Sequence, residues 1–250
     1  MKEFLYGRQP VHEALVAGRR QVFSILLART DRPVDVLRSI RAMAQERAIP
    51  VHETDGRELD RVCGEVNHQG VAADVSGYPY EDLTSLLAHA QEQGEPPLLL
   101  ILDHVQDPQN LGAILRAAET TGVHGVIIPR DRAVTVTAAA VRASAGAAEH
   151  LHVALVTNLA QTIESLKKHE IWVAGLEALP ESRNYTEADL KGPLALVVGS
   201  EGSGLARLVR ERCDFLIQLP MKGRINSLNV ASATAVALFE IRRQRAATHA

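Results

Sequence analysis

Three short stretches of the sequence gather polar side chains directly after apolar runs. They read LDHVQDPQNLGAILR, VVGSEGSGL and LPMKGRINSLN. Together they hold five side chains that could act in concert: Asn110, Arg116, Glu201, Ser227 and Asn229. A guanidinium binds phosphate as a fixed cation, and amides, hydroxyls and carboxylates can orient that cation or a substrate hydroxyl. The residue types alone do not show which of these roles applies here.

Each stretch also has an ordinary structural explanation. Asn110 can be a helix cap, and Arg116 a solvated side chain on the helix that follows. The glycines at 199, 202 and 204 form a G-x-x-G-x-G turn, which is neither the dinucleotide-binding fingerprint nor a P-loop. Near the start of the last helix, Asn226 or Ser227 alone would suffice as a cap. Taken singly, none of the stretches identifies a site.

The elements around these stretches alternate between strand and helix from Leu98 onward. Apolar runs that are typical of strands buried on both faces occur at residues 98–103, 125–129, 152–156, 171–177, 194–199 and 215–220. Helical segments separate them, and an Ala-rich helix follows Asn229. This alternation predicts an α/β fold with a parallel sheet. Since ligands bind at the carboxyl ends of such strands, we expect the three polar stretches to converge there.

Shifts in composition predict the domain organisation. Residues 1–76 are typical of a small α/β unit, with helices at 10–18 and 33–48 and strands at 22–28, 50–54 and 70–76. Residues 77–97 have the Gly- and Pro-rich composition of a linker. Residues 98–250 form the larger α/β domain.

Composition and cysteine usage exclude several classes of protein. The 250 residues carry a net charge of −3, and 46% of them are apolar, which is enough for a sizeable core. No apolar run is long enough to cross a membrane, and the first ten residues lack the apolar core of a signal peptide. Cys63 and Cys213 have no partner motif, so we expect neither a disulfide framework nor a structural zinc site, and a reducing cytoplasm fits.

Other catalytic classes lack their signatures. His150 and His152 share one face of a predicted strand, but no acidic or Cys partner stands at ligand spacing, and we expect no metal. The G-x-S-x-G elbow of serine hydrolases is missing. The first strand of the larger domain is not followed by the G-x-G-x-x-G of a nicotinamide dehydrogenase.

Taken in order, three segments resemble the motifs of the SpoU (TrmH)-type RNA ribose 2′-O-methyltransferases of the SPOUT superfamily. The segments are NLGAILRAAETTGVHGVIIP, LALVVGSEGSGL and LPMKGRINSLNVASATAVALFE, and the resemblance covers about the last 150 residues. In the first domain, YGRQPVHEAL and VNHQGVAADV resemble the L30e-like RNA-binding domain of one subgroup. That subgroup methylates a guanosine in 23S ribosomal RNA.

The resemblance implies a fold, a cofactor and an assembly. The C-terminal domain would contain a deep trefoil knot, and the protein would be a homodimer. S-adenosylmethionine would be the cofactor, bound at Gly199, Leu219 and Leu228 largely through backbone groups. The implied reaction is methyl transfer to the ribose 2′-hydroxyl of a guanosine in 23S ribosomal RNA, in the cytoplasm, without a membrane or a metal.

The same resemblance implies a role for each polar residue. The family's base corresponds to Arg116, although an arginine is almost never deprotonated. A simpler physical role is a cation that binds the substrate phosphate and stabilises the developing alkoxide. Asn110 would position Arg116 or the ribose, and Glu201 would orient Arg116 or a backbone loop. Ser227 and Asn229 would contact phosphate or fix the knot loop.

Two alternatives stay open, namely transfer RNA as the substrate and a non-catalytic RNA-binding protein with the same fold. Four arginines are candidates for further phosphate contacts, although each is otherwise a solvated surface side chain: Arg8, Arg19, Arg20 and Arg142. Three more at the C-terminus are interpreted as a solvated helix end that complements the helix dipole: Arg242, Arg243 and Arg245.

Overall fold

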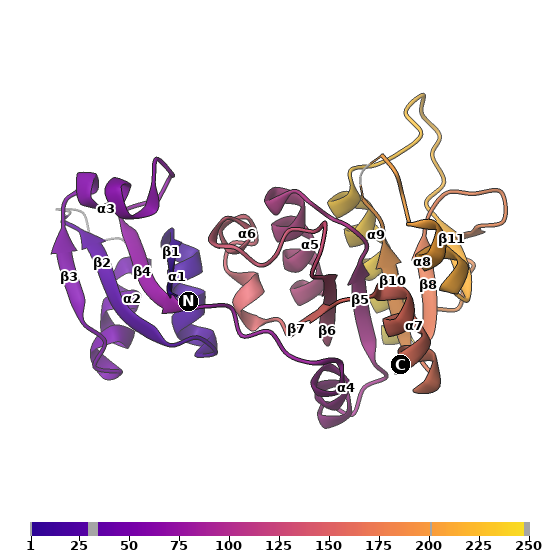
Figure 1. Ribbon diagram of the computed structural model, residues 1–250, viewed down its shortest axis with the longest axis horizontal. Helices are drawn as coiled ribbons and strands as arrows, with labels where there is room; N and C mark the ends of the chain where they lie inside the picture. The colour runs from indigo at the N-terminus through magenta and orange to yellow at the C-terminus, as the bar shows by residue number, and fades with distance from the viewer. Residues whose placement is uncertain (1, 30–34, 201, 248–250) are drawn as a thin grey trace. The chain divides into compact units, whose positions relative to one another are not determined.

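The computed structural model describes residues 2–29, 35–200 and 202–247, and the chain divides into two compact units (Figure 1). Unit 1 consists of Met1–Pro79 and Val136–His150, and unit 2 consists of Tyr80–Thr135 and Leu151–Ala250. Two segments thus group differently from the predicted boundaries. Residues 80–97, predicted as linker, group with the larger unit, and residues 136–150 group with the smaller one.

Unit 1 is built on a sheet that has four strands in the described part of the chain, in the order β1-β4-β2-β3. These are β1 (Lys2–Tyr6), β2 (Val22–Ala28), β3 (Val51–Thr54) and β4 (Val71–Ser76). Strand β4 pairs antiparallel with β1 and β2, whereas β2 and β3 are parallel. The helices are α1 (Arg8–Ala17), α2 (Asp35–Glu46), α3 (Gly56–Cys63), α6 (Ala138–Ala143) and the 3-10 helix η1 (Ala147–His150).

The predicted elements of the first 76 residues are confirmed, with β1 and α3 in addition. Helix α1 ends where predicted, because Gly18 takes a left-handed φ of 62° that glycine adopts without strain. The start of α3 carries a signal that the sequence analysis did not use. Asp55 caps this helix by accepting a hydrogen bond from the Glu58 amide at 2.9 Å.

The helical segment expected between the strands at 125–129 and 152–156 is not one continuous helix. Helix α6 stops at Ala143, and η1 starts only at Ala147. Between them Gly146 has a φ of +89°, and a Cβ at this position would lie 2.7 Å from the Glu13 side chain. The break lets η1 contact α1 while α6 contacts β1, so this segment completes the core of unit 1.

A buried ion pair holds the end of that segment. Arg20 Nε lies 3.0 Å from Glu149 Oε2, and both side chains are shielded from solvent. Arg20 also donates to Glu3 at 2.7 Å, and its guanidinium lies 5.0 Å from the centre of the Tyr78 ring. The Tyr78 hydroxyl donates to the Ala148 carbonyl at 2.9 Å. Arg20 is therefore structural, and its predicted availability for phosphate is wrong.

Unit 2 is built on a parallel sheet, which has seven strands within the described ranges, in the order β7-β6-β5-β10-β8-β11-β9. The strands are β5 (Leu98–Leu102), β6 (Gly125–Pro129), β7 (Val153–Val156), β8 (Trp172–Leu176), β9 (Arg183–Asn184), β10 (Leu194–Val198) and β11 (Phe215–Gln218). The predicted α/β fold with a parallel sheet is confirmed. The two-residue β9 is too short for any apolar pattern, and no strand is predicted there.

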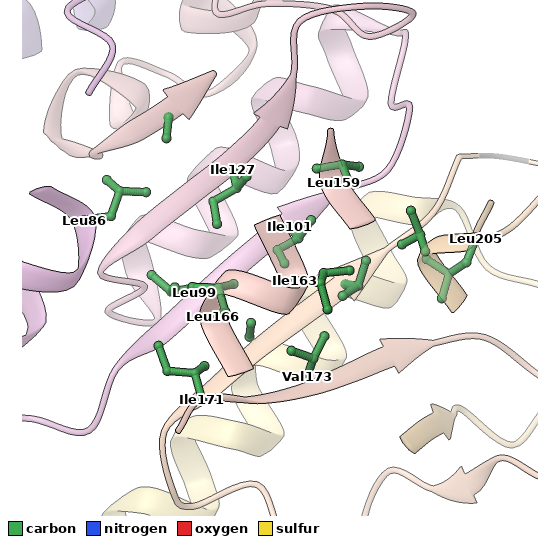
Figure 2. Close-up of a cluster of buried hydrophobic side chains, with 14 residues drawn as sticks. Leu86, Leu99, Ile101, Ile127, Leu159, Ile163, Leu166, Ile171, Val173 and Leu205 are labelled. Carbon is green, nitrogen blue, oxygen red and sulfur yellow. The ribbon is translucent and has the colours of Figure 1, made fainter. Parts of the chain in front are cut away.

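Two helical layers cover this sheet. The helices are α4 (Leu83–Glu92), α5 (Pro108–Thr120), α7 (Leu159–Lys168), α8 (Arg207–Arg212) and α9 (Val230–Ala246). Figure 2 shows one face, where Leu99 and Ile101 of β5 pack with Ile163 and Leu166 of α7. The strand residues that alternate with these, such as Leu100, are fully buried as well. Helices α5 and α9 contact each other in the second layer.

The end of α9 differs from its predicted solvated state at one residue. Arg245 is buried and donates to three backbone carbonyls, those of Pro96, Pro97 and Gly192, at 2.7–2.9 Å. Arg242 and Arg243 are exposed as expected. Arg245 therefore fastens the last helix to the start of β5. None of the helices in the described part of the chain is long and apolar enough to cross a membrane.

The Arg20–Glu149 pair predicts a large, pH-dependent stability effect. Burial raises the pKa of Glu149, and the Arg20 guanidinium opposes that rise. Arg20→Ala removes the strongest opposition to this rise and leaves only the weaker effect of Arg19, and we expect the free energy of unfolding to fall by about 3–5 kcal/mol at neutral pH. The deficit should grow as the pH rises, because a carboxyl with a raised pKa destabilises the folded state when it ionises.

Urea denaturation at several pH values measures this effect. The matched control is Arg41→Ala. It removes an ion pair of similar N–O distance, 2.8 Å to Glu53, but both side chains of this pair are about half exposed. We expect that change to cost under about 1 kcal/mol. Equal losses in the two variants would contradict a structural role for the buried pair.

Candidate functional site

The strand order of unit 2 indicates where a ligand would bind. From β5 the chain continues to β6 and β7 on one side, whereas β10, β8, β11 and β9 lie on the other side. The order therefore reverses between β5 and β10, which pair from Leu98–Leu194 to Leu102–Val198. Ligands of such sheets bind outside the carboxyl ends of the strands at this reversal. The first two polar stretches directly follow β5 and β10.

A cavity of about 680 Å³ lies at the carboxyl ends of β8, β10 and β11. Its walls come from the residues after these three strands and from the first turn of α9. Five predicted site residues line it: Gly199, Leu219, Ser227, Leu228 and Asn229. Asn110 and Arg116 are not among the described residues that line it, and Glu201 lies outside the described residues.

Glycines let the turn after β10 fold back on itself. A Cβ on Gly199 would lie 2.3 Å from the carbonyl carbon and oxygen of Gly204, so only glycine fits there. Gly204 has a φ of +65°, and its amide donates to the Ser200 carbonyl at 3.2 Å. Gly199, Gly202 and Gly204 carry no side chains, so part of this wall of the cavity is peptide backbone, beside Ser200 and Ser203.

Two carboxylates hold the far end of the turn. The buried Asp103, directly after β5, accepts a hydrogen bond from the Ala206 amide at 2.6 Å, just before α8 begins. Glu177, directly after β8, accepts from the Leu205 amide at 3.4 Å and lies 3.6 Å from the Arg210 guanidinium. The sequence analysis did not single out either residue. Their positions in the sequence could have indicated them, since each is the first acidic residue after a buried strand.

One hydrogen bond joins the first polar stretch to the third. Nδ2 of Asn229 donates to Oδ1 of Asn110 at 2.9 Å, across 119 residues of chain. Asn229 also caps α9, because its Oδ1 accepts from the Ala231 and Ser232 amides at 2.9 and 3.3 Å. A single amide therefore fixes the first turn of α9 and ties it to α5.

The helix caps are not the residues that the sequence analysis considered. Asp107 caps α5, with Pro108 in the first turn, so a capping role for Asn110 is wrong. The Asn110 side chain contacts Asn229 instead. In α9 the cap is Asn229 rather than Asn226 or Ser227. The side chains of Asn226 and Ser227 are exposed where they line the cavity.

Arg116 is exposed on α5. Its backbone carbonyl accepts from the Thr120 hydroxyl at 3.0 Å, but its side chain forms no hydrogen bond or ion pair with any of the residues described. The guanidinium is therefore accessible to an anion from solution. Its predicted partner Glu201 belongs to the undescribed residues, so that pairing stays a prediction.

Neither cysteine fits a reactive thiol. Both are free, and burial raises the pKa of each. For Cys213, which precedes β11, the pKa rises to about 12, and its Sγ donates to the Val209 carbonyl. A thiol of that pKa stays protonated at neutral pH, so a covalent cysteine intermediate is not indicated.

Comparisons with known proteins match both parts of the chain. A profile described as the SpoU rRNA Methylase family matches residues 97–239, and one described as RNA 2′-O ribose methyltransferase substrate binding matches residues 4–81. The Pseudomonas putida protein named 23S rRNA (guanosine-2′-O-)-methyltransferase RlmB is 42% identical over 97% of this chain and 97% of its own. YacO of Bacillus subtilis, whose name places it among TrmH family tRNA/rRNA methyltransferases, is 41% identical over 97% of this chain and 96% of its own.

Solved structures share the fold. AviRb of Streptomyces viridochromogenes, a SpoU methyltransferase crystallised with AdoMet, superposes with a TM-score of 0.81 at 24% identity, covering 98% of this chain and 91% of that one. An AdoMet-bound rRNA methyltransferase from Sinorhizobium meliloti gives a TM-score of 0.79 at 26% identity, covering 97% and 87%.

The tight turn after β10 predicts a steric penalty at Gly199. In Gly199→Ala the new Cβ collides with the Gly204 backbone, and we expect the free energy of unfolding to drop by about 1–3 kcal/mol. The matched control is Gly192→Ala, where a Cβ would meet nothing within 4 Å. Urea denaturation of both variants checks the difference, and a Gly199→Ala protein as stable as the control would refute the close approach.

Proposed function

Because the chain belongs to the SpoU rRNA methylase family and is an RNA methyltransferase, we propose that it methylates the ribose 2′-hydroxyl of a guanosine in 23S ribosomal RNA, using S-adenosylmethionine. The observation that carries the proposal is the convergence of Gly199, Leu219 and Leu228 on one cavity. The Pseudomonas putida relative, which is named for this reaction and aligns over nearly its whole length, supports the guanosine of 23S ribosomal RNA. We also propose that the protein acts in the cytoplasm, where this RNA would be found.

The cavity fits S-adenosylmethionine in size and in character. Its volume of about 680 Å³ falls within the range of small-molecule sites, about 300–1,000 Å³. The bare backbone at Gly199 offers hydrogen-bonding groups, and Leu219 and Leu228 supply apolar walls. When bound, S-adenosylmethionine supplies a methyl group on a positively charged sulfur, which an oxygen nucleophile can displace.

The role of Arg116 follows from its exposure and its chemistry. A guanidinium is a permanent cation with several N–H donors. We assign it to a phosphate next to the target ribose, where it also stabilises the alkoxide that develops on the 2′-oxygen. Alignment of the two substrates can lower the barrier by about 7–11 kcal/mol. This assignment does not require the guanidinium to act as the base that the family resemblance suggests.

The remaining polar residues act mainly by positioning. The Asn110–Asn229 hydrogen bond sets the start of α9 against α5, the helix that carries Arg116. Ser227 is exposed at the cavity and can reach phosphate or ribose. Glu201, in the same turn as Gly199, is assigned to orient Arg116 or the turn itself.

A homodimer with a trefoil-knotted C-terminal domain is part of the proposal. Helix α9 exposes two large apolar side chains, Val236 at 40% and Phe239 at 56%. Apolar side chains of this size on the face of a terminal helix are typical of a covered interface. The threaded terminus would place this helix beside the cofactor cavity in each protomer.

The function is tested by mapping 2′-O-methyl groups in RNA from cells that lack the protein and are complemented with wild type or Arg116→Ala. We expect one ribosomal guanosine to lose its methyl group and only the wild type to restore it. Calorimetry should show that Arg116→Ala binds S-adenosylmethionine within about twofold of wild type. The control Arg212→Ala removes an exposed arginine that pairs with Glu164 and should restore methylation.

The same map separates the substrates. Transfer RNA is the alternative substrate, since the name of YacO mentions both tRNA and rRNA. If the missing methyl group belongs to a transfer RNA, the proposal of 23S ribosomal RNA as substrate is wrong. Normal methylation by Arg116→Ala would show that this arginine has no catalytic role.

The dimer is tested by Phe239→Glu, because a carboxylate buried in an apolar interface without a partner is strongly unfavourable. We expect sedimentation equilibrium to give a dimer for wild type and a monomer for the variant. Trp172→Glu, at an aromatic side chain that is 60% exposed at the start of β8, should stay dimeric. A wild-type monomer would overturn this part of the proposal.

A further inference from the structure

Three segments of unit 2 meet at the β7 edge of the sheet. Glu81 pairs with Ala154 in a parallel β-bridge, and its amide donates to the Val153 carbonyl at 2.9 Å. Helix α4 follows directly and carries His89 near its end, and His152 comes just before β7. The chain therefore enters unit 2 as an added edge segment with three titratable side chains around it.

These three side chains form a compact cluster. Glu81 Oε2 lies 2.8 Å from His89 Nε2, and Glu81 Oε1 lies 2.7 Å from His152 Nδ1. The two imidazole rings stack with centroids 3.6 Å apart. One ligand atom from each residue lies within 4.8 Å of the others. Each side chain is 21–28% exposed, so solvent can reach the cluster.

We propose that Glu81, His89 and His152 bind a divalent transition-metal ion of the zinc class. Two imidazoles and one carboxylate are a donor set that zinc uses, with a water in the fourth position. Imidazole ligands favour zinc, copper or nickel over magnesium and calcium, which prefer oxygen. Neutral imidazoles can bind the ion by moving the ring proton to the other nitrogen.

Metal binding would change the present contacts of the cluster in two ways. Metal–ligand bonds of about 2.0–2.1 Å in a tetrahedron place neighbouring ligand atoms about 3.3 Å apart. The present contacts of 2.7 and 2.8 Å would therefore open by about half an ångström. The two rings are now stacked, so at least one imidazole must also rotate before both nitrogens can point at one ion. Both side chains are 27–28% exposed.

A fourth residue completes the arrangement behind His89. Glu92 Oε2 lies 3.7 Å from His89 Nδ1, the nitrogen that would not contact the ion. Metal-bound histidines usually donate this second N–H to a carboxylate, which fixes the tautomer and the ring. Glu92 is 74% exposed and one helical turn from His89, so it can close that distance by rotating.

The structure also explains why the sequence analysis predicts no metal here. It paired His152 with His150, two residues away, and found no acidic ligand nearby. In the structure His150 belongs to unit 1 and contacts Glu13 at 2.8 Å. The acidic partner of His152 is Glu81, 71 residues away. None of the three proposed ligands lines the cofactor cavity, so the metal site is independent of the proposed methyl transfer.

Calorimetric titration of the full-length protein with zinc chloride tests the site. We expect one saturable equivalent per chain in wild type and at least a tenfold weaker association in Glu81→Gln and in His89→Gln. The matched control is His150→Gln, which removes a histidine that also contacts a glutamate and should bind zinc as wild type does. Substitution with cobalt should give the visible absorption of a tetrahedral site in wild type and in the control only.

Unfolding curves without metal establish whether each variant is folded. The second measurement is the change in unfolding temperature when zinc is added. Zinc should raise the unfolding temperature of wild type and of His150→Gln, and should not raise that of Glu81→Gln. Absence of saturable binding in wild type would show that the three residues form only a hydrogen-bonded cluster. Undiminished binding in both Glu81→Gln and His89→Gln would place the ion elsewhere.

Discussion

Backbone contact between Gly199 and Gly204 is the constraint on which the cavity depends. Because Gly199 has no side chain, the backbone of Gly204 can approach it closely after the turn that follows β10. A hydrogen bond from the Gly204 amide to the Ser200 carbonyl closes this turn. The residues that follow then reach two strand ends, where Asp103 and Glu177 accept their amides. One turn thereby joins the ends of three neighbouring strands, β5, β10 and β8. At its glycines the turn presents peptide backbone to the cavity, and Ser200 and Ser203 line it as well.

Most strands of unit 2 could be predicted because each carries its own signal. A strand buried on both faces is a continuous apolar run, and β5 and β10 are buried along their whole length. Capping carries a local signal as well, since Asp107 precedes Pro108 and Asp55 precedes Glu58 by three residues. Strand β9 has two residues and no pattern. It exists because β11 offers it a paired edge.

The sequence predicts which turns form the site, but it does not predict which side chains contact one another there. Glycine and asparagine mark the turns locally, and Gly199, Leu219 and Leu228 do line one cavity. The arginines show that burial of a charged side chain cannot be predicted from the sequence around it. Arg20 and Arg245 are buried by partners that are distant in the chain, whereas Arg116 is exposed. The three have the same side chain, and only the folded neighbourhood decides which of them can meet phosphate.

The chain passes between the two units three times, because Val136–His150 leaves the larger unit, packs in the smaller one and returns. Unit 1 is therefore built from two separate stretches of the chain. A fragment cut between Pro79 and Tyr80 would separate Val141, Ala148 and Glu149 from the rest of unit 1, where they are buried. Exchange of unit 1 between related enzymes would likewise need two matched replacements, one at the N-terminus and one inside the catalytic half. The boundary of unit 1 therefore does not coincide with the boundary of the match to the SpoU rRNA Methylase family, because that match includes Val136–His150.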